Sequence, residues 1–174
     1  MNLHGLMKVK LEKILGLDDG EYRFHFESGA KEIGIELKDY EGHDVFDRPI
    51  ITDVILNKTS HLYYVKFHAA SDARFLCDRC LEDARKKIEG SFEVIYTDLK
   101  SRREEHDSES EVRLIEINKA NEISLDKDVC DTLLLEIPIK VLCKEDCKGL
   151  CVECGANLNE ALCQHAVAPM SANN

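Results

Sequence analysis

Apolar and polar residues alternate along four stretches in the middle of the chain. They cover residues 50–57, 63–69, 73–77 and 88–97. A period of two places successive side chains on opposite faces of a β-strand. Short polar segments at 57–60 and 71–72 predict turns between the first three stretches. The pattern therefore predicts an antiparallel meander, with the segment Cys77–Cys80 at the tip of the hairpin between its third and fourth strands.

The pattern is weaker toward both ends of the chain. Residues 22–26 and 33–37 alternate and predict two further strands, and residues 6–17 fit either a short helix or a strand followed by a turn. Val112–Ile117 predicts another strand. The intervening segment 101–111 is almost wholly polar, so it cannot bury apolar surface and is expected to form a mobile loop.

A spacing of four predicts one amphipathic helix near residues 124–137. Its apolar face consists of Leu125, Val129, Leu133 and Ile137, with Cys130 and Leu134 on the same side. Ser124 is expected to cap the first turn. Pro138 ends the helix, because the residue before a proline avoids the helical conformation. The helix should pack on the sheet, with Cys130 as a small buried apolar residue.

These elements predict an α+β fold, dominated by an antiparallel sheet or a small barrel. We expect residues 1–142 to form this body, residues 143–165 to form a cysteine-rich segment packed on it, and residues 166–174 to be a flexible tail. No stretch approaches the ~18 apolar residues of a membrane-spanning helix, and the N-terminus lacks the features of a secretion signal. The expected location is therefore the cytoplasm, without a membrane partner.

The chain carries a net charge of −11, from 34 acidic and 23 basic residues. Bulk attraction to nucleic acid is therefore not expected, because neutralising phosphates requires a basic face. A local basic cluster surrounds the first cysteine pair and supplies candidate RNA contacts. It consists of Arg74, Arg79, Arg85, Lys86 and Lys87. The alternative interpretation is that these are solvated side chains of an acidic protein.

Eight cysteines and one late histidine carry the candidate chemistry. Cys77 and Cys80 form a C-x2-C pair, and Cys143, Cys147, Cys151, Cys154, Cys163 and His165 follow within residues 143–165. Cysteines this dense in a chain without secretory features indicate metal rather than disulfides. Without Cys130, eight candidate ligands remain, which is enough for two tetrahedral zinc sites.

Two partitions of these ligands are open. In the first, Cys77, Cys80, Cys143 and Cys147 hold one ion, and Cys151, Cys154, Cys163 and His165 hold another. In the second, Cys77, Cys80, Cys151 and Cys154 form a single zinc ribbon, with the others left over or in a second mixed site. In either partition, four protein ligands surround an ion and leave no ligand position for a substrate. The cysteines therefore predict one or two structural Zn²⁺ ions rather than catalysis.

Other functions remain as alternatives. The spacing Cys147-x3-Cys151-x2-Cys154 matches the iron–sulfur cysteines of radical enzymes that use S-adenosylmethionine, although those enzymes resemble α/β barrels. C-x2-C pairs also permit a thiol switch that loses its metal on oxidation. A zinc-module regulator that binds nucleic acid is a further alternative, disfavoured by the negative charge. The sequence shows no phosphate-binding loop, nucleophile elbow or His-Glu-x-x-His motif.

Three motifs together resemble a known family. They are Cys77-Asp-Arg-Cys80-Leu-Glu, Leu135-Glu-Ile-Pro138 and Cys147-Lys-Gly-Leu-Cys151-x-x-Cys154-Gly-Ala-Asn-Leu-Asn159. They are similar to the bacterial YceD family, also called large ribosomal RNA subunit accumulation proteins, over roughly residues 45–165. Within the family pattern, Cys77 and Cys80 match the first pair, and Cys143, Cys147, Cys151 and Cys154 match the C-terminal cysteines.

The resemblance implies a non-enzymatic factor for 23S ribosomal RNA accumulation and assembly of the large ribosomal subunit. Its partners would be ribosomal RNA or ribosomal and assembly proteins, and no small-molecule substrate is implied. The chain departs from the family pattern in two places. Cys163-Gln-His165 stands where members commonly have Cys-x-Cys, and Val152 stands where a proline is usual. Some relatives lack the C-terminal cysteine block altogether.

Overall fold

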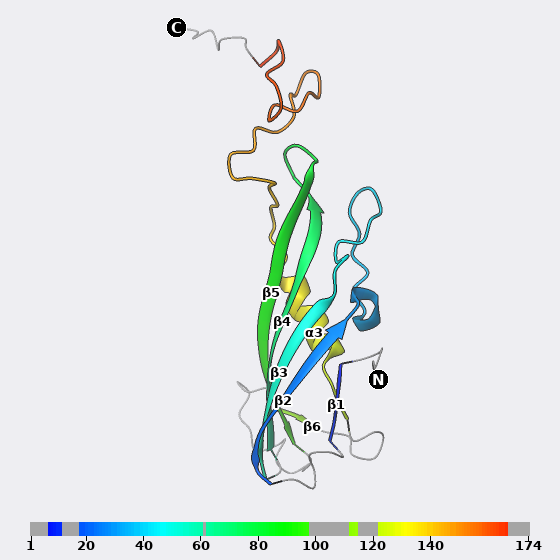
Figure 1. Ribbon diagram of the computed structural model, residues 1–174, viewed down its shortest axis with the longest axis vertical. Helices are drawn as coiled ribbons and strands as arrows, with labels where there is room; N and C mark the ends of the chain where they lie inside the picture. Colours follow the sequence, from blue (N-terminus) through cyan, green and yellow to red (C-terminus); the bar gives the residue numbers. More distant parts are fainter. Residues whose placement is uncertain (1–6, 12–17, 61, 98–111, 115–121, 167–174) are drawn as a thin grey trace.

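The computed structural model describes residues 7–11, 18–60, 62–97, 112–114 and 122–166. Five strands form one sheet in the order β2-β3-β4-β5-β6. They are β2 (Gly20–Ser28), β3 (Ile50–Thr59), β4 (Leu62–Leu76), β5 (Asp83–Thr97) and β6 (Val112–Leu114). The first four pair antiparallel, and β6 runs parallel to β5. Figure 1 shows β4 and β5 rising together toward the C-terminal segment.

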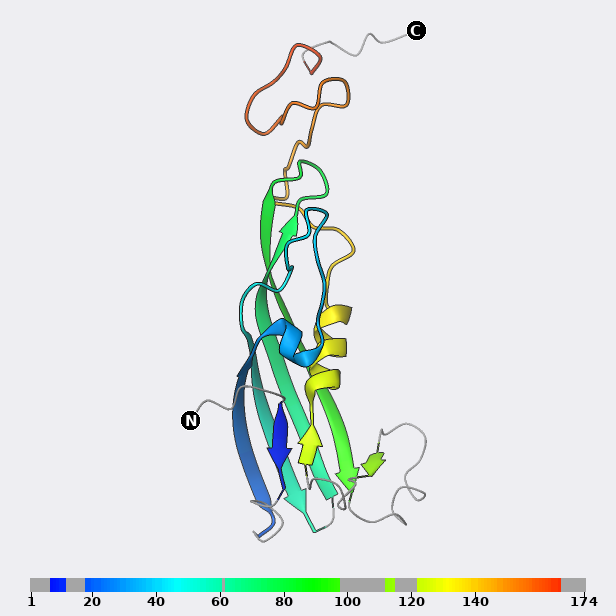
Figure 2. The ribbon, with the colours of Figure 1, turned by 90° about the vertical axis from the view of Figure 1, so that its right-hand side faces the viewer.

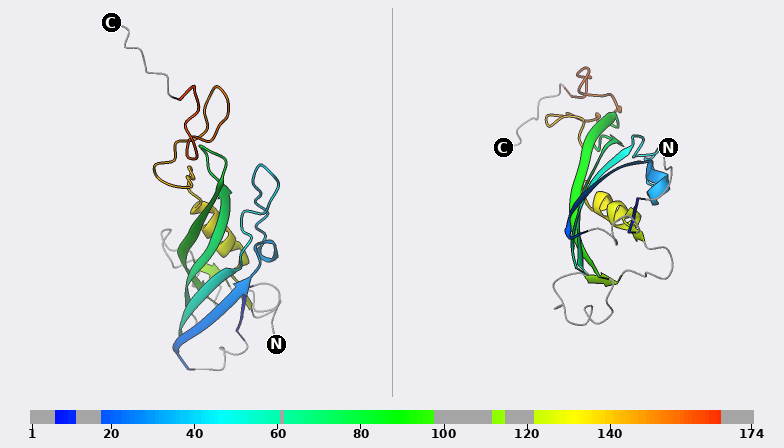
Figure 3. Two further views of the ribbon diagram at one scale, coloured as in Figure 1. Left: turned by 45° about the horizontal axis from the view of Figure 1, so that its top comes forward. Right: turned by 60° about the horizontal axis from the view of Figure 1, so that its bottom comes forward.

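Smaller elements cover one face of this sheet. β1 (Lys8–Lys10) pairs with β7 (Glu122–Ser124) in a separate two-stranded sheet, and η1 (Ala30–Ile33) is a short 3-10 helix. α3 (Asp126–Leu135) is the α-helix in the described part of the chain. The five-stranded sheet curves around α3, while β1 and β7 lie on the same side (Figures 2 and 3). The fold is therefore a mainly antiparallel sheet with a helix packed in its concave face.

The alternation along the strands explains this arrangement. Apolar side chains of the central strands, including Val54, Leu56, Val65, Phe67 and Val94, are buried on the concave face. They form one cluster with Leu125, Val129 and Leu133, the predicted apolar face of the helix, all of which are fully buried. The apolar area removed from water between helix and sheet stabilises the body. The antiparallel meander and the hairpin tip at Cys77–Cys80 are confirmed, with Leu76 opposite Asp83.

The turn predicted at Ser71–Asp72 is wrong, because β4 continues unbroken from Leu62 to Leu76. Ser71 is buried and its hydroxyl donates to the backbone carbonyl of Arg48 at 3.3 Å. Asp72 lies opposite Lys87 on β5. Polar side chains with partners of this kind are compatible with a strand, so the two predicted strands 63–69 and 73–77 are one. The turn predicted at 57–60 is shorter, because β3 extends to Thr59.

The strand predicted at residues 33–37 is also wrong. A 3-10 helix forms at Ala30–Ile33, where the Glu32 carboxylate accepts a hydrogen bond from the backbone N–H of Gly29 at 2.9 Å. Gly34 then has a φ of 87°, a left-handed conformation that glycine adopts without steric cost and that ends the helix. The apolar residues Ile33 and Ile35 are buried from this turn rather than from a strand.

The helix is shorter than its pattern predicts. Ser124 belongs to β7, its hydroxyl donates to Asp126 at 2.8 Å, and Leu125 occupies the N-cap position. The Asp126 carboxylate accepts from the backbone N–H of Met7 at 2.6 Å, which joins the start of α3 to β1. Ile137 lies beyond the helix, and Leu134 is 39% exposed. Cys130 is half-buried against the core. The predictions for residues 12–17, 101–111, 115–117 and 167–174 lie outside the described residues.

α3 approaches β5 closely at Gly90. A Cβ atom there would lie 2.6 Å from the Thr132 methyl group and 3.1 Å from Glu136 Cγ. Gly90→Val is therefore expected to destabilise the protein by about 1–3 kcal/mol through overpacking, measured by urea unfolding. Thr132→Ser should recover part of this loss when combined with it. Gly20→Ala, with nothing within 4 Å, is the control expected to change little. Additive losses in the double variant would contradict the close approach.

Candidate metal centres at the hairpin tip

The turn between β4 and β5 brings the first two cysteines together. Cys77 N–H donates to the Glu82 carbonyl at 2.8 Å, and Leu81 N–H donates to the Cys77 carbonyl at 2.9 Å. Leu81 adopts a left-handed φ of 61° to close this turn. The result is a tight C-x2-C turn at the tip of a long hairpin, in which Cys77 and Cys80 are both buried.

Two distant cysteines join this turn. The sulfur atoms of Cys77 and Cys147 are 3.7 Å apart, and those of Cys80 and Cys143 are 3.6 Å apart. All four sulfurs lie within 4.8 Å of one another. We call these four residues the inner site. A tetrahedral ion with bonds of about 2.3 Å to sulfur requires sulfur–sulfur distances of about 3.8 Å.

The inner site fits a soft metal ion better than disulfides. All four cysteines are free, and their sulfur distances far exceed the ~2.05 Å of a disulfide bond. These two sulfur–sulfur distances are opposite edges of one tetrahedron, since they share no atom. This donor set can therefore hold one tetrahedral metal ion between the hairpin tip and the segment that follows α3.

The electrostatics of the inner site favour a cation. Burial raises the pKa of Cys77, but hydrogen bonds from the backbone N–H groups of Cys143, Arg79 and Cys80 outweigh it and lower this pKa to about 6. Burial raises the pKa of Cys80 to about 12, and neighbouring sulfurs add to the effect. The cluster thus accommodates only some of its sulfurs as thiolates unless a bound cation balances the charge.

The residues between the cysteines hold the two segments in place. The Asp78 N–H donates to the Val141 carbonyl at 2.9 Å, and its carboxylate accepts from the Val141 N–H at 2.6 Å. The Arg79 guanidinium donates to the Cys147 carbonyl at 2.7 Å. The Arg79 carbonyl accepts from the Leu150 N–H at 3.0 Å. Asp78 and Arg79 therefore each hold the C-terminal segment on the hairpin tip through hydrogen bonds that need no metal.

A second group of candidate ligands lies farther along the C-terminal segment. Cys151, Cys154, Cys163 and His165 place their ligand atoms within 4.8 Å of one another, and we call them the outer site. Cys151 is buried, whereas Cys154 and His165 are exposed. Backbone N–H groups of Cys154 and Glu153 lower the pKa of Cys151 to about 7. This set can also hold one metal ion, in a more open setting than the inner site.

The structure groups the candidate ligands as in the first of the two partitions. Cys77 and Cys80 lie with Cys143 and Cys147, whereas the ribbon would have required Cys151 and Cys154 beside them. The grouping also separates Cys147 from Cys151 and Cys154, the three cysteines with the spacing of radical enzymes. The antiparallel sheet differs from the α/β barrels of those enzymes as well.

Two asparagines that the sequence analysis did not assign connect the outer segment to the inner site. Asn159 Nδ2 donates to the sulfur of Cys147 at 3.3 Å, and its Oδ1 accepts from Lys148 N–H at 2.9 Å. Asn157 Oδ1 accepts from the Asn159 side chain at 2.9 Å. The signal was present in Cys154-Gly-Ala-Asn-Leu-Asn159, because small polar residues with this spacing favour side-chain to backbone hydrogen bonds.

Asn159→Ala is expected to weaken metal binding at the inner site by about tenfold, as for other residues that orient a ligand. The variant removes the donor to the Cys147 sulfur. Competition with a chromophoric chelator measures the affinity. Asn159→Asp is the matched variant, since it keeps the acceptor for Lys148 but loses the donor. An unchanged affinity in Asn159→Ala would show that the sulfur contact has no role.

Four of the five basic residues predicted to contact RNA have acidic or structural partners. Arg74 pairs with Asp83 at 2.7 Å and Asp39 at 3.3 Å. Arg85 makes two contacts with Asp47, at 2.7 and 3.0 Å, and Lys87 lies 2.6 Å from Glu89. Arg79 contacts Cys147, and Lys86 is half-buried. RNA contact through these residues stays a prediction.

The geometry defines a small α+β protein with two compact, four-ligand sets that can each hold a metal ion. The family model described as "Large ribosomal RNA subunit accumulation protein YceD" matches residues 65–173, more than half of the chain, so the chain belongs to this family. The matched region contains most of the hairpin of β4 and β5, together with α3 and both sites. No solved structure is significantly similar to the chain.

Curated relatives match shorter parts. A chloroplastic YCED homolog 1 of Arabidopsis thaliana is 44% identical over 45 residues, 26% of this chain and 14% of that protein. An uncharacterised protein of Mycobacterium tuberculosis is 31% identical over 83 residues, 47% of this chain and 38% of that protein. The homolog 1 of Zea mays is 50% identical over 38 residues, 22% of this chain and 13% of that protein. The chain thus covers well under half the length of these relatives.

Within the described residues, no helix has the length and apolar character needed to cross a membrane.

Proposed function

We propose that this protein is a non-enzymatic factor for accumulation of the large ribosomal subunit's RNA and for assembly of that subunit. Membership of the YceD family supports the proposal, because the description of that family names accumulation of the large ribosomal RNA subunit. The family match includes the cysteine motifs that form both sites. Partners would be ribosomal RNA or ribosomal and assembly proteins.

We further propose that both sites bind Zn²⁺ as a structural ion. Sulfur ligands and tetrahedral spacing suit zinc, and mixed cysteine and histidine sets such as the outer site are common for it. Each set already supplies four ligands, so no ligand position remains for a substrate or water. The ions would hold the C-terminal segment on the hairpin tip rather than take part in a reaction.

The charge pattern favours a protein over RNA as the first contact. The net charge is −11, and three of the five predicted RNA-contacting residues pair with carboxylates. Binding phosphates through them would break these ion pairs. We place this function in the cytoplasm, where thiols stay reduced; the Arabidopsis and maize relatives are named as chloroplastic proteins.

Removing the gene from its own cells tests the function. We expect the ratio of large-subunit to small-subunit ribosomal RNA to fall and the wild-type chain to restore it. A chain lacking the inner-site sulfurs should fail to restore it, whereas Cys130→Ala, outside both sites, should succeed at equal protein abundance. An unchanged ratio after gene removal would contradict the proposed role.

A further inference from the structure

β2 forms one margin of the five-stranded sheet (Figure 1). All nine of its residues pair with β3, and among the described residues no strand pairs with its other side. Edge strands are usually protected by a proline, by a bulge or by being very short. β2 contains no proline and keeps a continuous register with β3 over its whole length. Its outward backbone N–H and C=O groups can therefore pair with a further strand.

The concave side of β2 carries three aromatic residues that the core covers only in part. Tyr22, Phe24 and Phe26 are half-buried and pack against the core cluster. The rings of Phe24 and Phe26 are stacked, with their centroids 6.4 Å apart. Val54, which lies opposite Phe24 on the neighbouring strand β3, is buried. One more strand beside β2 would extend the sheet and cover the remaining aromatic surface.

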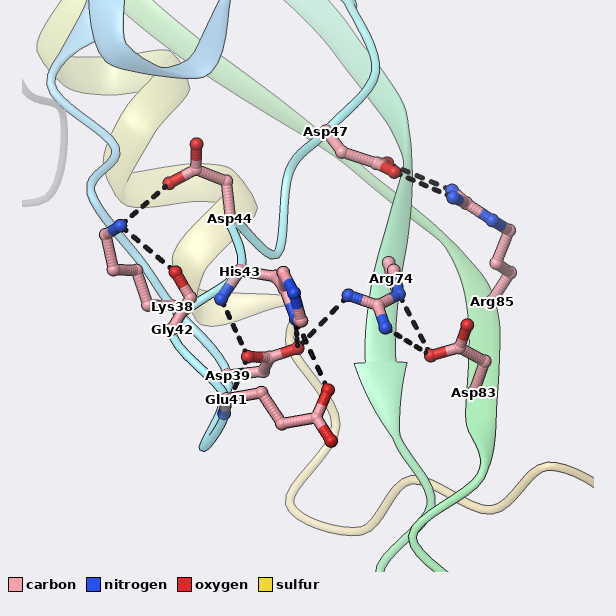
Figure 4. A network of polar contacts seen from close by, with 10 residues as sticks. All are labelled: Lys38, Asp39, Glu41, Gly42, His43, Asp44, Asp47, Arg74, Asp83 and Arg85. Carbon is pink, nitrogen blue, oxygen red and sulfur yellow. Dashed lines mark hydrogen bonds and ion pairs between the residues drawn. The ribbon is translucent and has the colours of Figure 1, made fainter.

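The solvent side of β2 carries a charge without a partner. Elsewhere on the sheet, Arg74 and Arg85 pair with carboxylates of the loop 37–47 (Figure 4). Glu27, in contrast, is exposed and makes no hydrogen bond or ion pair with the described residues. A strand beside β2 with a basic residue opposite Glu27 would be favoured, because opposite charges across two strands attract.

β2 itself has the sequence that such a strand requires. In an antiparallel pair of two β2 strands with His25 opposite His25, Arg23 lies opposite Glu27 and Phe24 lies opposite Phe26. Two-fold symmetry makes each of these contacts occur twice. The symmetry also places the aromatic rows of the two copies on the same side of the joined sheet. Both the charged side and the aromatic side of the strand are thus self-complementary.

Neighbouring registers bring like charges together. Centring the pair on Phe24 would set Glu21 opposite Glu27, and centring it on Arg23 would set two guanidinium groups opposite each other. Like charges directly opposite destabilise a strand pair. Arg23 contacts Glu21 in its own chain at 2.8 Å, but their side chains are 73% and 45% exposed, so this pair contributes little. The five N–H donors of a guanidinium can serve both carboxylates.

We propose that β2 binds β2 of a second copy of this chain, antiparallel and centred on His25, so that one sheet continues across both copies. An interface of one strand from each copy is small, so the dimer is weak and depends on protein concentration. The proposal goes beyond the assembly role and needs neither metal ion, because β2 contributes no residue to the inner or outer site.

Sedimentation of the full chain over a range of concentrations tests this proposal. We expect a reversible dimer in the wild type. Arg23→Glu and Glu27→Arg should each weaken self-association about tenfold, because each places like charges opposite one another. The double variant should restore the wild-type affinity, since it exchanges the two charges. Lys66→Glu is the control, because Lys66 is exposed in the same row of the sheet as Arg23 but on the interior strand β4.

Hydrogen exchange on the wild type gives a second measurement that needs no variant. Amides of residues 20–28 should become more protected as the protein concentration rises, while the other strands change little. Four results would overturn the proposal. They are a chain that stays monomeric at all concentrations, single variants that associate as the wild type does, a double variant as weak as the single ones, and concentration-dependent protection that leaves β2 unchanged.

Discussion

Cys77→Ser is expected to remove one metal ion per chain and to lower the free energy of unfolding by about 4 kcal/mol or more, as when a structural metal is lost. Cys77 is fully buried at the end of β4, and its sulfur lies 3.7 Å from that of Cys147. A serine hydroxyl is a poor ligand for a soft ion. The hairpin tip and the segment after α3 would then no longer be joined through a shared metal ion. Metal analysis and urea unfolding measure the two effects.

Cys130→Ser is the matched control for this prediction. Cys130 is a free cysteine on α3, half-buried against the core and outside both ligand groups. The same substitution there should leave the metal content unchanged and cost only the local packing of one side chain. If Cys77→Ser keeps the metal content and stability of the wild type, Cys77 is not a ligand.

Cys163→Ser is expected to release one metal ion while the β-rich body keeps its stability. The outer site includes the exposed Cys154 and His165, and its segment contacts the hairpin through hydrogen bonds such as Asn157 Nδ2 to Glu82 at 3.4 Å. Loss of this ion should therefore loosen only residues near 151–166. Limited proteolysis followed by mass spectrometry should find new cuts in that range and nowhere else.

The contrast between the two variants is itself informative. Buried cysteines join two distant segments at the inner site, whereas the outer site closes one local segment on itself. A large loss of body stability in Cys163→Ser, equal to that in Cys77→Ser, would show that the two sites act as one folding unit. Cobalt substitution distinguishes which ion is lost, since a four-sulfur set and a three-sulfur, one-nitrogen set give different absorption bands.

The sequence predicted most of the body because burial alone imposes the alternation of β3, β4 and β5. The apolar face of α3 was predicted for the same reason, since Leu125, Val129 and Leu133 are all fully buried. The errors arose where a polar residue has a partner distant in sequence. Ser71 donates to Arg48, and polar composition alone could not distinguish that contact from a turn.

The sequence named candidate ligands but not the residues that hold them in place. Sulfur chemistry and spacing limited the eight ligands to two partitions, and only the folded chain shows which sulfurs are neighbours. The roles of Asp78, Arg79 and Asn159 depend on contacts between segments more than 60 residues apart or on side-chain direction. The pairing of β1 with β7 was missed because strands of three residues carry too short a pattern.

X-ray absorption at the zinc edge, on protein purified without added metal, tests the central claim most directly. We predict two zinc ions per chain in the wild type. Cys163→Ser should leave a single ion with four sulfur neighbours at about 2.3 Å, and Cys77→Ser should leave one ion with three sulfur neighbours and one nitrogen. Two results would contradict the account. The first is a wild-type chain without zinc. The second is a chain that loses its ion when Cys77 or Cys151 is replaced but keeps it when Cys143 is replaced.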